Sequence, residues 1–430
     1  MDEKTKSNFL IFWIGQAISQ LGSSITRFAL VIWVFNKTGS AMSVSLVTLS
    51  SYLPYILASI LSGDVVDKLS KKIVLIVSDT IAAFCTISIV FCIYADVLSV
   101  WQVYVVSAII GLTNAFQSPA SAVVTGMLVP GGRYDKASGL NSFSNNLVMI
   151  VAPMLAGILV AFAGLKIVLL VDFSTFLFAA VTLLFFVNIK ESPESDIKKP
   201  SRWLDGFREG FVFLRRQKGI LHIMLSMALI NFFSRLTYEN ILAPMILSRS
   251  GGNSAVYGIV SGVLGIGGVI GGFLVLVRKK KANPLKLIYF SAAFSFLFGD
   301  LLIGVGRDLW IWCIGGLAAS IPIPFILAGQ SMVLYRIVPQ QMQGRMFAVR
   351  NVIQSSTIPI GIFLGGFLAE YVFEPFMLSS HIFAIALRKI VGSGKGSGMA
   401  FMFLCTGVLG AIFSWLGYRD KDIRNLENKT

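Results

Sequence analysis

Residues 41–94 read AMSVSLVTLSSYLPYILASILSG, DVVDKLSKK and IVLIVSDTIAAFCTISIVFCIY, which are two apolar runs separated by a short charged segment. A helix needs about 20 apolar residues to cross the hydrocarbon core of a bilayer, and each run is long enough. The stretch therefore predicts two neighbouring membrane-spanning helices joined by a charged loop at the membrane surface.

The rest of the chain has the same character. Of its 430 residues, 55% are hydrophobic and 13% are charged, whereas a soluble protein carries about 25% charged residues. This composition excludes a water-soluble enzyme, a disordered chain and a coiled coil. Apolar runs of spanning length lie near 9–35, 41–63, 73–94, 98–126, 138–163, 166–189, 219–247, 255–277, 285–305, 309–337, 346–373 and 399–418. We predict an all-α integral membrane protein with twelve transmembrane helices.

The charge balance supports one orientation of these helices. The chain has 36 Lys and Arg against 21 Asp and Glu, a net charge of +15. In a soluble domain such an excess would suggest nucleic acid binding. With a cytoplasmic N-terminus, however, the segments on that side hold most of the basic residues, as the positive-inside rule requires. We therefore expect a multi-pass protein of the cell (plasma) membrane, with both termini cytoplasmic, in contact with the lipid bilayer and not with nucleic acid.

Cysteine and histidine are too few and too scattered for a metal centre. The four cysteines lie inside apolar runs without a CxxC pair, and the only histidines are His222 and His381. The cysteines are interpreted as buried apolar side chains, not as disulfides or metal ligands. We predict no metal and no cofactor.

Two long polar segments interrupt the apolar runs. Residues 190–218 divide the chain into an N-terminal six-helix bundle (1–189) and a C-terminal six-helix bundle (219–430). This cytoplasmic linker contains an amphipathic helix, because apolar residues recur at helical spacing in it: Trp203, Leu204, Phe207, Phe211 and Leu214. The second segment, 374–398, ends in a glycine-rich run and is expected to be a flexible outer connector.

The two halves repeat each other. A shift of 209 residues maps Gly63 onto Gly272 and Val129-Pro130 onto Val338-Pro339. One offset shared by separate loops and helices predicts two pseudo-symmetric six-helix halves, with a substrate site between them near the midplane of the membrane.

The loop after residue 62 carries the most specific motif. Its sequence, Gly63-Asp-Val-Val-Asp67-Lys68-Leu-Ser70-Lys71-Lys72, resembles the G-x-x-x-D-[RK]-x-[GR]-[RK]-[RK] signature of the major facilitator superfamily, with a departure at Ser70. The glycine lets two helices approach closely, and the aspartate can accept charge-assisted hydrogen bonds. The resemblance implies the major facilitator fold and a gate motif made of Gly63, Asp67, Lys68, Lys71 and Lys72.

A second motif points to export. Ala152-Pro153-Met-Leu-Ala156-Gly157 is similar to the antiporter motif G-P-x-x-G-G of that superfamily, with alanine at two glycine positions. A purely structural kink is the alternative. Across both halves the chain resembles the macrolide- and multidrug-efflux branch, which implies a drug:proton antiporter that exports lipophilic drugs by alternating access. One departure is Ser107, where the family often has an arginine four residues before Gly111.

The resemblance also places the substrate cavity. In the family, the first, fourth, seventh and tenth helices line it. The polar residues that these helices would present here are Gln16, Gln20, Asn114, Asn231, Tyr238 and Gln330. Hydrogen bonding between helices explains each of these residues equally well.

Charged residues inside a membrane are costly, and for that reason they usually have a function. Arg235 and Glu239 are four residues apart on one helix and can pair. Our hypothesis is that Glu239 carries the proton and that Arg235 modulates its affinity; a static ion pair is the alternative. Arg27 is near-symmetric to Arg235. Asp172 and Asp300 are weaker candidates, because the sixth and ninth helices usually face outward in the family. Asp79 is expected to serve the gate loop.

Two other functions remain open. A facilitator-type transporter of a polar metabolite or siderophore would need a more highly charged cavity. A membrane-embedded enzyme or sensor would need a catalytic set such as HExxH, and this sequence has none. We predict that the chain is not an enzyme. Its partners are expected to be a small lipophilic drug and protons, and we expect it to act as a monomer.

Overall fold

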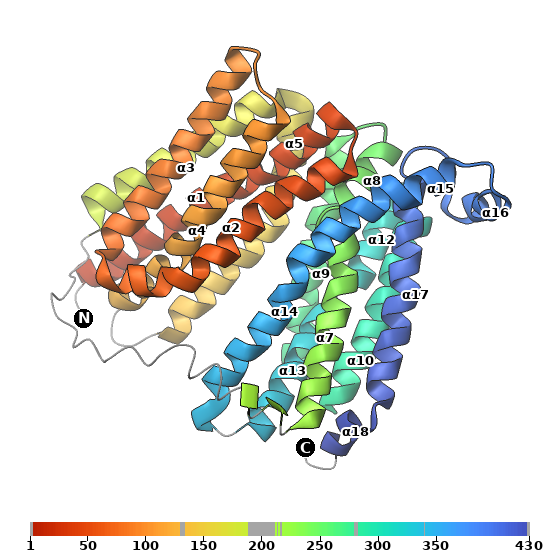
Figure 1. Ribbon diagram of the computed structural model, residues 1–430. Coiled ribbons are helices and arrows are strands. Elements are labelled where there is room, and N and C mark those ends of the chain that lie inside the picture. Colours follow the sequence, from red (N-terminus) through yellow and green to blue (C-terminus); the bar gives the residue numbers. More distant parts are fainter. Residues whose placement is uncertain are drawn as a thin grey trace. The chain divides into compact units, whose positions relative to one another are not determined.

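The computed structural model describes residues 3–129, 134–187, 211–212, 214–215, 217–278, 283–338 and 340–427, and within these ranges it contains helices and loops but no strand. The helices of the chain up to residue 187 are α1 (Glu3–Thr38), α2 (Ala41–Lys68), α3 (Lys71–Tyr94), α4 (Val100–Leu128), α5 (Tyr134–Val181) and the π-helical turn η2 (Thr182–Phe186) (Figure 1).

The helices after residue 217 are more often interrupted. They are α7 (Lys218–Thr237), α8 (Leu242–Arg249), α9 (Ser254–Val277), α10 (Pro284–Phe294), η3 (Ser295–Asp300), α11 (Leu301–Val305), α12 (Leu309–Ser320), α13 (Ile323–Ile337), α14 (Gln340–Leu368), η4 (Ala369–Phe373), α15 (Glu374–Leu378), α16 (Ile382–Val391), α17 (Ser397–Arg419) and α18 (Lys421–Glu427).

Ten helical stretches of the described chain are long and apolar enough to cross a membrane, so the protein is an all-helical, multi-pass membrane protein. The predicted count of twelve differs from this in two places. The helix α4 forms as expected but is not among the ten. The runs predicted at 138–163 and 166–189 are continuous in α5, where two helices meet at a kink at Gly164. The φ of Gly164 is 73°, a backbone conformation that glycine adopts without steric cost.

The chain divides into two compact units. The first consists of 1–193 together with 252–262, and the second of 194–251 together with 263–430. The first residues of α9 therefore group with the first unit, although the sequence places them in the C-terminal half.

In the first unit, two helices pack directly on each other's backbone. Gly111 of α4 faces α2, and a methyl group added there would overlap the carbonyl oxygen of Ser51. A small residue is needed at this position because the two helices leave no room for a side chain. The buried side chains near one end of the unit form an apolar cluster that includes Phe12, Leu75 and Val124.

The two prolines in Ile321-Pro322-Ile323-Pro324 predict a helix break in the second unit, and the structure confirms it. The helix α12 ends at Ser320 and α13 begins at Ile323. Proline cannot donate the backbone hydrogen bond that would continue the helix. Gly271 of α9 accommodates the break, because a methyl group added there would overlap the carbonyl oxygen of Ile321.

The contact between α2 and α4 gives a first testable prediction. Gly111→Val should lower the thermal unfolding midpoint of the purified protein, since overpacking a tight contact costs about 1–3 kcal/mol. The matched control is Gly126→Ala on the same helix, where an added methyl group meets no atom within 4 Å. Equal midpoints for the two variants would show that α4 does not pack on the α2 backbone at Gly111.

Candidate functional site

The predicted ion pair lies at a break between two helices. Arg235 is in the last turn of α7, Glu239 is in the turn that follows it, and α8 begins at Leu242. The Arg235 guanidinium forms an ion pair with the Glu239 carboxylate, and both side chains are partly exposed. The sequence predicted one continuous helix through this region. Interrupted membrane helices form the substrate and ion sites of many transporters.

The side chain of Asn240 supports this break. Its Nδ2 donates a hydrogen bond to the carbonyl oxygen of Ile362 at 2.8 Å, which ties the turn to α14. The same helix approaches α7 closely, because a methyl group added to Gly365 would lie 2.4 Å from the Leu236 carbonyl oxygen. There is no room for a side chain at this position. The turn is therefore held in place from α14.

Asp300 is adjacent to this break and is deeply buried, with 1% of its surface exposed. The Tyr238 hydroxyl donates to its Oδ1 at 2.7 Å, and the Thr406 hydroxyl donates to its Oδ2 at 2.9 Å. Within the described ranges these neutral hydroxyls are its side-chain partners, and no Lys or Arg pairs with it. Asp300 therefore points into the second unit, toward the turn after α7 and toward α17.

The first unit contains a similar arrangement around Asp172. This buried carboxylate accepts hydrogen bonds from Ser23 of α1 at 3.2 Å and from Thr86 of α3 at 3.0 Å. Arg27, which is exposed on α1, also interacts with this carboxylate. Asp172 therefore points into the first unit. Each unit thus buries one aspartate between hydroxyl groups of two other helices.

The structure places Asp79, which is predicted to serve the gate loop, in a buried polar group. Gln117 Nε2 of α4 donates to Asp79 Oδ1 at 2.5 Å, and Gln16 of α1 reaches the same carboxylate. Three helices of the first unit therefore meet at this aspartate. In the sequence, this polar group could have been recognised from an aspartate in the third apolar run and glutamines in the first and fourth apolar runs.

The six predicted cavity residues are divided equally between the two units. Gln16 bonds to Asp79, Gln20 donates to Asn145 Oδ1 at 3.0 Å, and Tyr238 donates to Asp300. Asn114 and Asn231 are half-buried.

Gln330 is buried and borders a small pocket of the second unit. It accepts a hydrogen bond from Gln354 Nε2 at 3.4 Å. The pocket has an empty volume of about 250 Å³ and lies between α7, α13 and α14. Its walls are mostly apolar, with Arg350 and the two glutamines as polar groups.

The gate motif is described only in part. The side chains of Gly63, Asp67 and Lys68 lie outside the described part of the chain, and Lys71 is half-buried. Lys72 Nζ donates to the carbonyl oxygens of Leu184 at 3.3 Å and Val187 at 3.0 Å. These are carbonyls at the end of η2, where no helical partner is available. Most of the predicted amphipathic helix in the linker likewise falls outside the described residues.

The antiporter-like motif forms a packing surface in the first unit. Ala152, Pro153, Ala156 and Gly157 are all buried. A methyl group on Gly157 would lie 2.5 Å from the Ser254 carbonyl oxygen, and the Ser254 hydroxyl donates to the Gly157 carbonyl oxygen at 3.0 Å. These small residues let α5 approach residues 254–262, which belong to the same unit.

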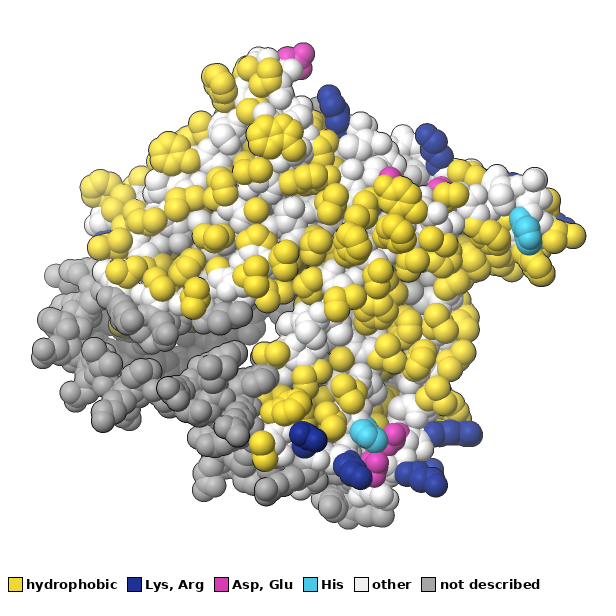
Figure 2. Space-filling model, in the orientation of Figure 1, with side chains coloured by type: hydrophobic (Ala, Val, Ile, Leu, Met, Phe, Trp, Pro, Cys, Tyr) yellow, Lys and Arg dark blue, Asp and Glu magenta, His cyan; other side chains and the backbone are white. Residues whose placement is uncertain are grey.

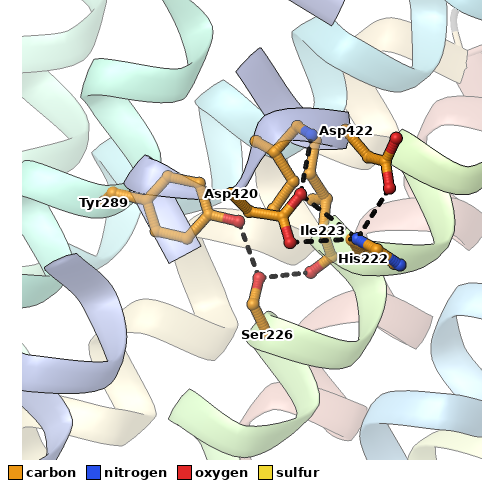
Figure 3. A network of polar contacts seen from close by, with 7 residues as sticks. His222, Ile223, Ser226, Tyr289, Asp420 and Asp422 are labelled. Atoms are coloured by element: carbon orange, nitrogen blue, oxygen red, sulfur yellow. Dashed lines mark hydrogen bonds and ion pairs between the residues drawn. The ribbon is translucent and has the colours of Figure 1, made fainter. Parts of the chain in front are cut away.

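A polar cluster joins α7 to the C-terminal helix α18 (Figure 3). His222 Nδ1 lies 3.1 Å from Asp420 Oδ2 and 3.6 Å from Asp422 Oδ2. Asp420 Oδ1 also accepts the backbone N–H of Ile423 at 3.0 Å, so Asp420 caps α18. Partial burial opposes the charge of Asp420, but the Ile423 N–H and the His222 ring outweigh it and hold the pKa of Asp420 below its ordinary value.

The cluster contains three groups of the kind that bind metal ions, with ligand atoms within 4.8 Å of one another. We interpret it as a structural clamp that holds α18 to α7, not as a metal site. The His222 ring is already bonded to Asp420, and Asp420 caps α18. The sequence did not reveal the contact, since His222 and Asp420 are 198 residues apart.

The segment 374–398 is not the flexible connector that its glycines suggested. It contains α15 and α16, and the Glu374 carboxylate accepts the backbone N–H groups of Gly396 at 2.5 Å, Gly398 at 2.8 Å and Met399 at 3.3 Å. The first N–H groups of α17 have no partner within their own helix, so a carboxylate is favourable there.

The long apolar helices define a multi-pass membrane protein. A family model described as "Transmembrane secretion effector" matches residues 4–393. The chain belongs to this family and is a transporter, not an enzyme. Together with relatives named for efflux, the match confirms the predicted resemblance to the efflux branch of the major facilitator superfamily.

Two curated relatives are named for efflux. Macrolide efflux protein A of Streptococcus pyogenes is 27% identical over 370 residues, which cover 85% of this chain and 90% of the relative. The multidrug efflux pump Tap of Mycolicibacterium fortuitum is 23% identical over 396 residues, which cover 86% and 91%.

Solved structures of transporters share the fold. An inward-facing bacterial homologue of the human lysosomal transporter Spinster matches with a TM-score of 0.69 at 17% identity, over 97% of this chain and 98% of that chain. An inward-facing bacterial homologue of the iron transporter ferroportin matches with a TM-score of 0.67 at 13% identity, over 96% and 98%.

The clamp on α18 gives a prediction about pH. The pKa of Asp420 is lower in the folded protein than in the unfolded chain. The ionised Asp420 carboxylate therefore makes its full contribution to stability above the ordinary aspartate pKa of about 4. The contribution is lost as the pH falls through the lowered pKa of the folded state. A nitroxide attached at Asn425→Cys in α18 should therefore become more mobile below about pH 4.

Variants of the two aspartates separate this effect from general acid unfolding. Asp420→Asn should raise the mobility of the label already at pH 7, because the histidine contact and the cap are both weakened. Asp422→Asn should retain the pH dependence. A label whose mobility does not respond to Asp420→Asn would contradict the clamp.

Proposed function

We propose that this protein exports lipophilic drugs, macrolide-type antibiotics or a broader range, in exchange for protons. In this proposal it has twelve spans in two pseudo-symmetric six-helix halves, lies in the plasma membrane with both termini in the cytoplasm, and works by alternating access. The efflux names of its relatives support the drug as substrate. The acidic groups at the break between α7 and α8 are the observation that supports proton coupling.

This break connects one short segment to two acidic groups. Tyr238 bonds to Asp300, and the next residue, Glu239, pairs with Arg235. A movement of this turn therefore changes the surroundings of both carboxyl groups together. When Glu239 separates from Arg235 in an apolar cavity, the negative charge of Glu239 loses its partner. The carboxylate then binds a proton more readily. Arg235 is then free to act on a different partner.

The proton gradient supplies enough energy for this exchange. A membrane potential of 100 mV contributes about 2.3 kcal/mol per charge, and one pH unit contributes about 1.4 kcal/mol. Together these support a drug gradient of roughly 500-fold for one proton per neutral drug molecule.

The pocket beside Gln330 is the described site that best fits part of a drug. It offers apolar side chains with a few polar groups, which is the composition of most small-molecule sites. Its interior is narrow and leaves room for a small group, not for a whole drug molecule. We propose that it receives one apolar substituent of the drug while the remainder lies elsewhere in the cavity.

Export is tested by the accumulation of drugs in energised cells that express this chain. Cells should accumulate less macrolide or other lipophilic drug than cells without the protein, and a protonophore should abolish the difference. Unchanged accumulation across a drug panel, with the protein present in the membrane, would favour the alternative of a polar metabolite or siderophore transporter.

The role of Glu239 is tested in proteoliposomes. Glu239→Gln should abolish drug transport driven by a pH gradient but retain drug exchange across the membrane without a gradient, because exchange needs no net proton movement. The control is Asp96→Asn, which changes an exposed carboxylate in the loop after α3. If Glu239→Gln retains gradient-driven transport, the Arg235–Glu239 pair is only structural, and Asp300→Asn and Asp172→Asn become the next variants to test.

A further inference from the structure

The short helix α16 (Ile382–Val391) is held firmly to the second unit. Its last carbonyl groups accept hydrogen bonds from two arginines: Arg307 Nη2 donates to Lys389 at 3.2 Å and to Ile390 at 3.4 Å, and Arg249 Nη2 donates to Val391. The final carbonyls of a helix lack partners of their own and carry partial negative charge, so guanidinium groups stabilise them.

The start of α16 is fixed as well. His381 Nδ1 accepts the backbone N–H of Phe383 at 3.3 Å, and Arg388 bonds back to the carbonyl oxygen of Ser379 before the helix. The helix is therefore a positioned element and not a mobile loop.

The partners of α16 place it where the membrane spans of the second unit end. Arg249 is the last residue of the candidate span Lys218–Arg249, and Arg307 follows the span Pro284–Val305. The candidate span Leu309–Ile337 begins just after Arg307, and its second residue, Trp310, is highly exposed. Exposed tryptophan at the end of a span is typical of the boundary between the hydrocarbon and the headgroups. In Figure 1, α16 lies beside α15 and the beginning of α17.

One side of α16 is apolar and uncovered. At 100° per residue, positions 382, 383, 386 and 390 share this side. The exposed fractions are 74% for Ile382, 68% for Phe383 and 50% for Ile390. Ala384 and Val391 lie on the opposite side and are buried. The helix therefore turns its small buried residues to the protein and its large apolar residues away from it, and Figure 2 shows apolar side chains gathered over this part of the unit.

Basic groups surround this apolar side. Lys389 is exposed beside it, Lys395 is exposed in the following glycine-rich turn, and Arg307 is exposed at the end of the helix. The nearby carboxylate of Glu374 is occupied by the backbone N–H groups that begin α17. The surroundings of α16 therefore favour a partner with an apolar body and negatively charged head groups.

We infer that α16 is an interfacial helix that binds the phospholipid surface at this end of the second unit. Its apolar side enters the boundary between acyl chains and headgroups, and its basic residues contact the phosphates. The bilayer is the occupant that the position of the helix favours, because the spans that end beside α16 have lipid-facing surfaces of their own. The inference does not depend on the transported substrate or on proton coupling.

The test uses spin labels on the full-length protein with its four cysteines replaced by serine. Single variants Ile382→Cys, Phe383→Cys, Ala386→Cys and Ile390→Cys carry a nitroxide on the apolar side of α16. Ser393→Cys, exposed in the glycine-rich turn, is the matched control. Each is reconstituted in vesicles of phosphatidylcholine alone and of phosphatidylcholine with phosphatidylglycerol. Power-saturation spectroscopy then compares access by oxygen, which enters lipid, with access by a water-soluble nickel chelate.

The four labels on α16 should be several-fold more accessible to oxygen than to the chelate, relative to the label at Ser393. Phosphatidylglycerol should reduce the access of the chelate to the four labels further, because anionic headgroups draw the basic residues toward the membrane. Access by the chelate equal to that at Ser393 would place the helix in water and overturn the inference. Exclusion of both reagents would show that a protein surface, for example a second copy of this chain, covers the helix instead.

A second variant keeps the test independent of any single label. With the nitroxide at Ile390→Cys, the double change Ile382→Ser and Phe383→Ser should increase access by the chelate. Both changed side chains are mostly exposed, so the fold should be retained. No increase would contradict the proposed contact between this side of α16 and lipid.

Discussion

The whole structure depends on one constraint, that polar groups within a membrane must find their partners inside the protein. Regular helices satisfy this condition with backbone hydrogen bonds, but this chain breaks several of its helices. Near two of these breaks a side chain bonds to a carbonyl oxygen of another helix: Asn240 bonds to that of Ile362, and Ser295 bonds to that of Ala319 at 2.6 Å. These bonds tie the interrupted segments to neighbouring helices.

The same constraint explains how the carboxylates are placed. Asp172 in the first unit and Asp300 in the second are each buried between hydroxyl groups from two other helices. A hydroxyl can serve a carboxyl group in either protonation state, because it can both donate and accept. The pair Arg235–Glu239 is different, since a guanidinium only donates. In the proposed cycle, Glu239 must therefore separate from Arg235 before a proton can bind to it.

The sequence predicted the features that composition and periodicity determine. It missed the features that depend on single contacts between distant residues. The all-helical membrane fold, the superfamily and the break at Ile321-Pro322 followed from apolar length, a charged motif and proline. The break after α7 was missed because residues 238–241 contain neither proline nor glycine. The hydroxyl partners of Asp172 and Asp300 were not predicted, because they come from segments far apart in the chain.

The contacts of segment 374–398 could not be predicted from the sequence either. Its glycines suggested flexibility, but the three N–H groups bound to Glu374 need a compact turn that glycine permits. No local pattern indicates that contact. The transport roles of the predicted site residues, the twelve-span count and the gate remain predictions.

The central claim is that drug and proton compete through the acidic groups of this protein. The most direct measurement is the release of protons when a macrolide is added to the purified protein in weakly buffered solution. The account predicts that drug binding releases protons and that the release disappears at a pH where the carboxyl groups are already ionised. Saturable drug binding without proton release at any pH would contradict it.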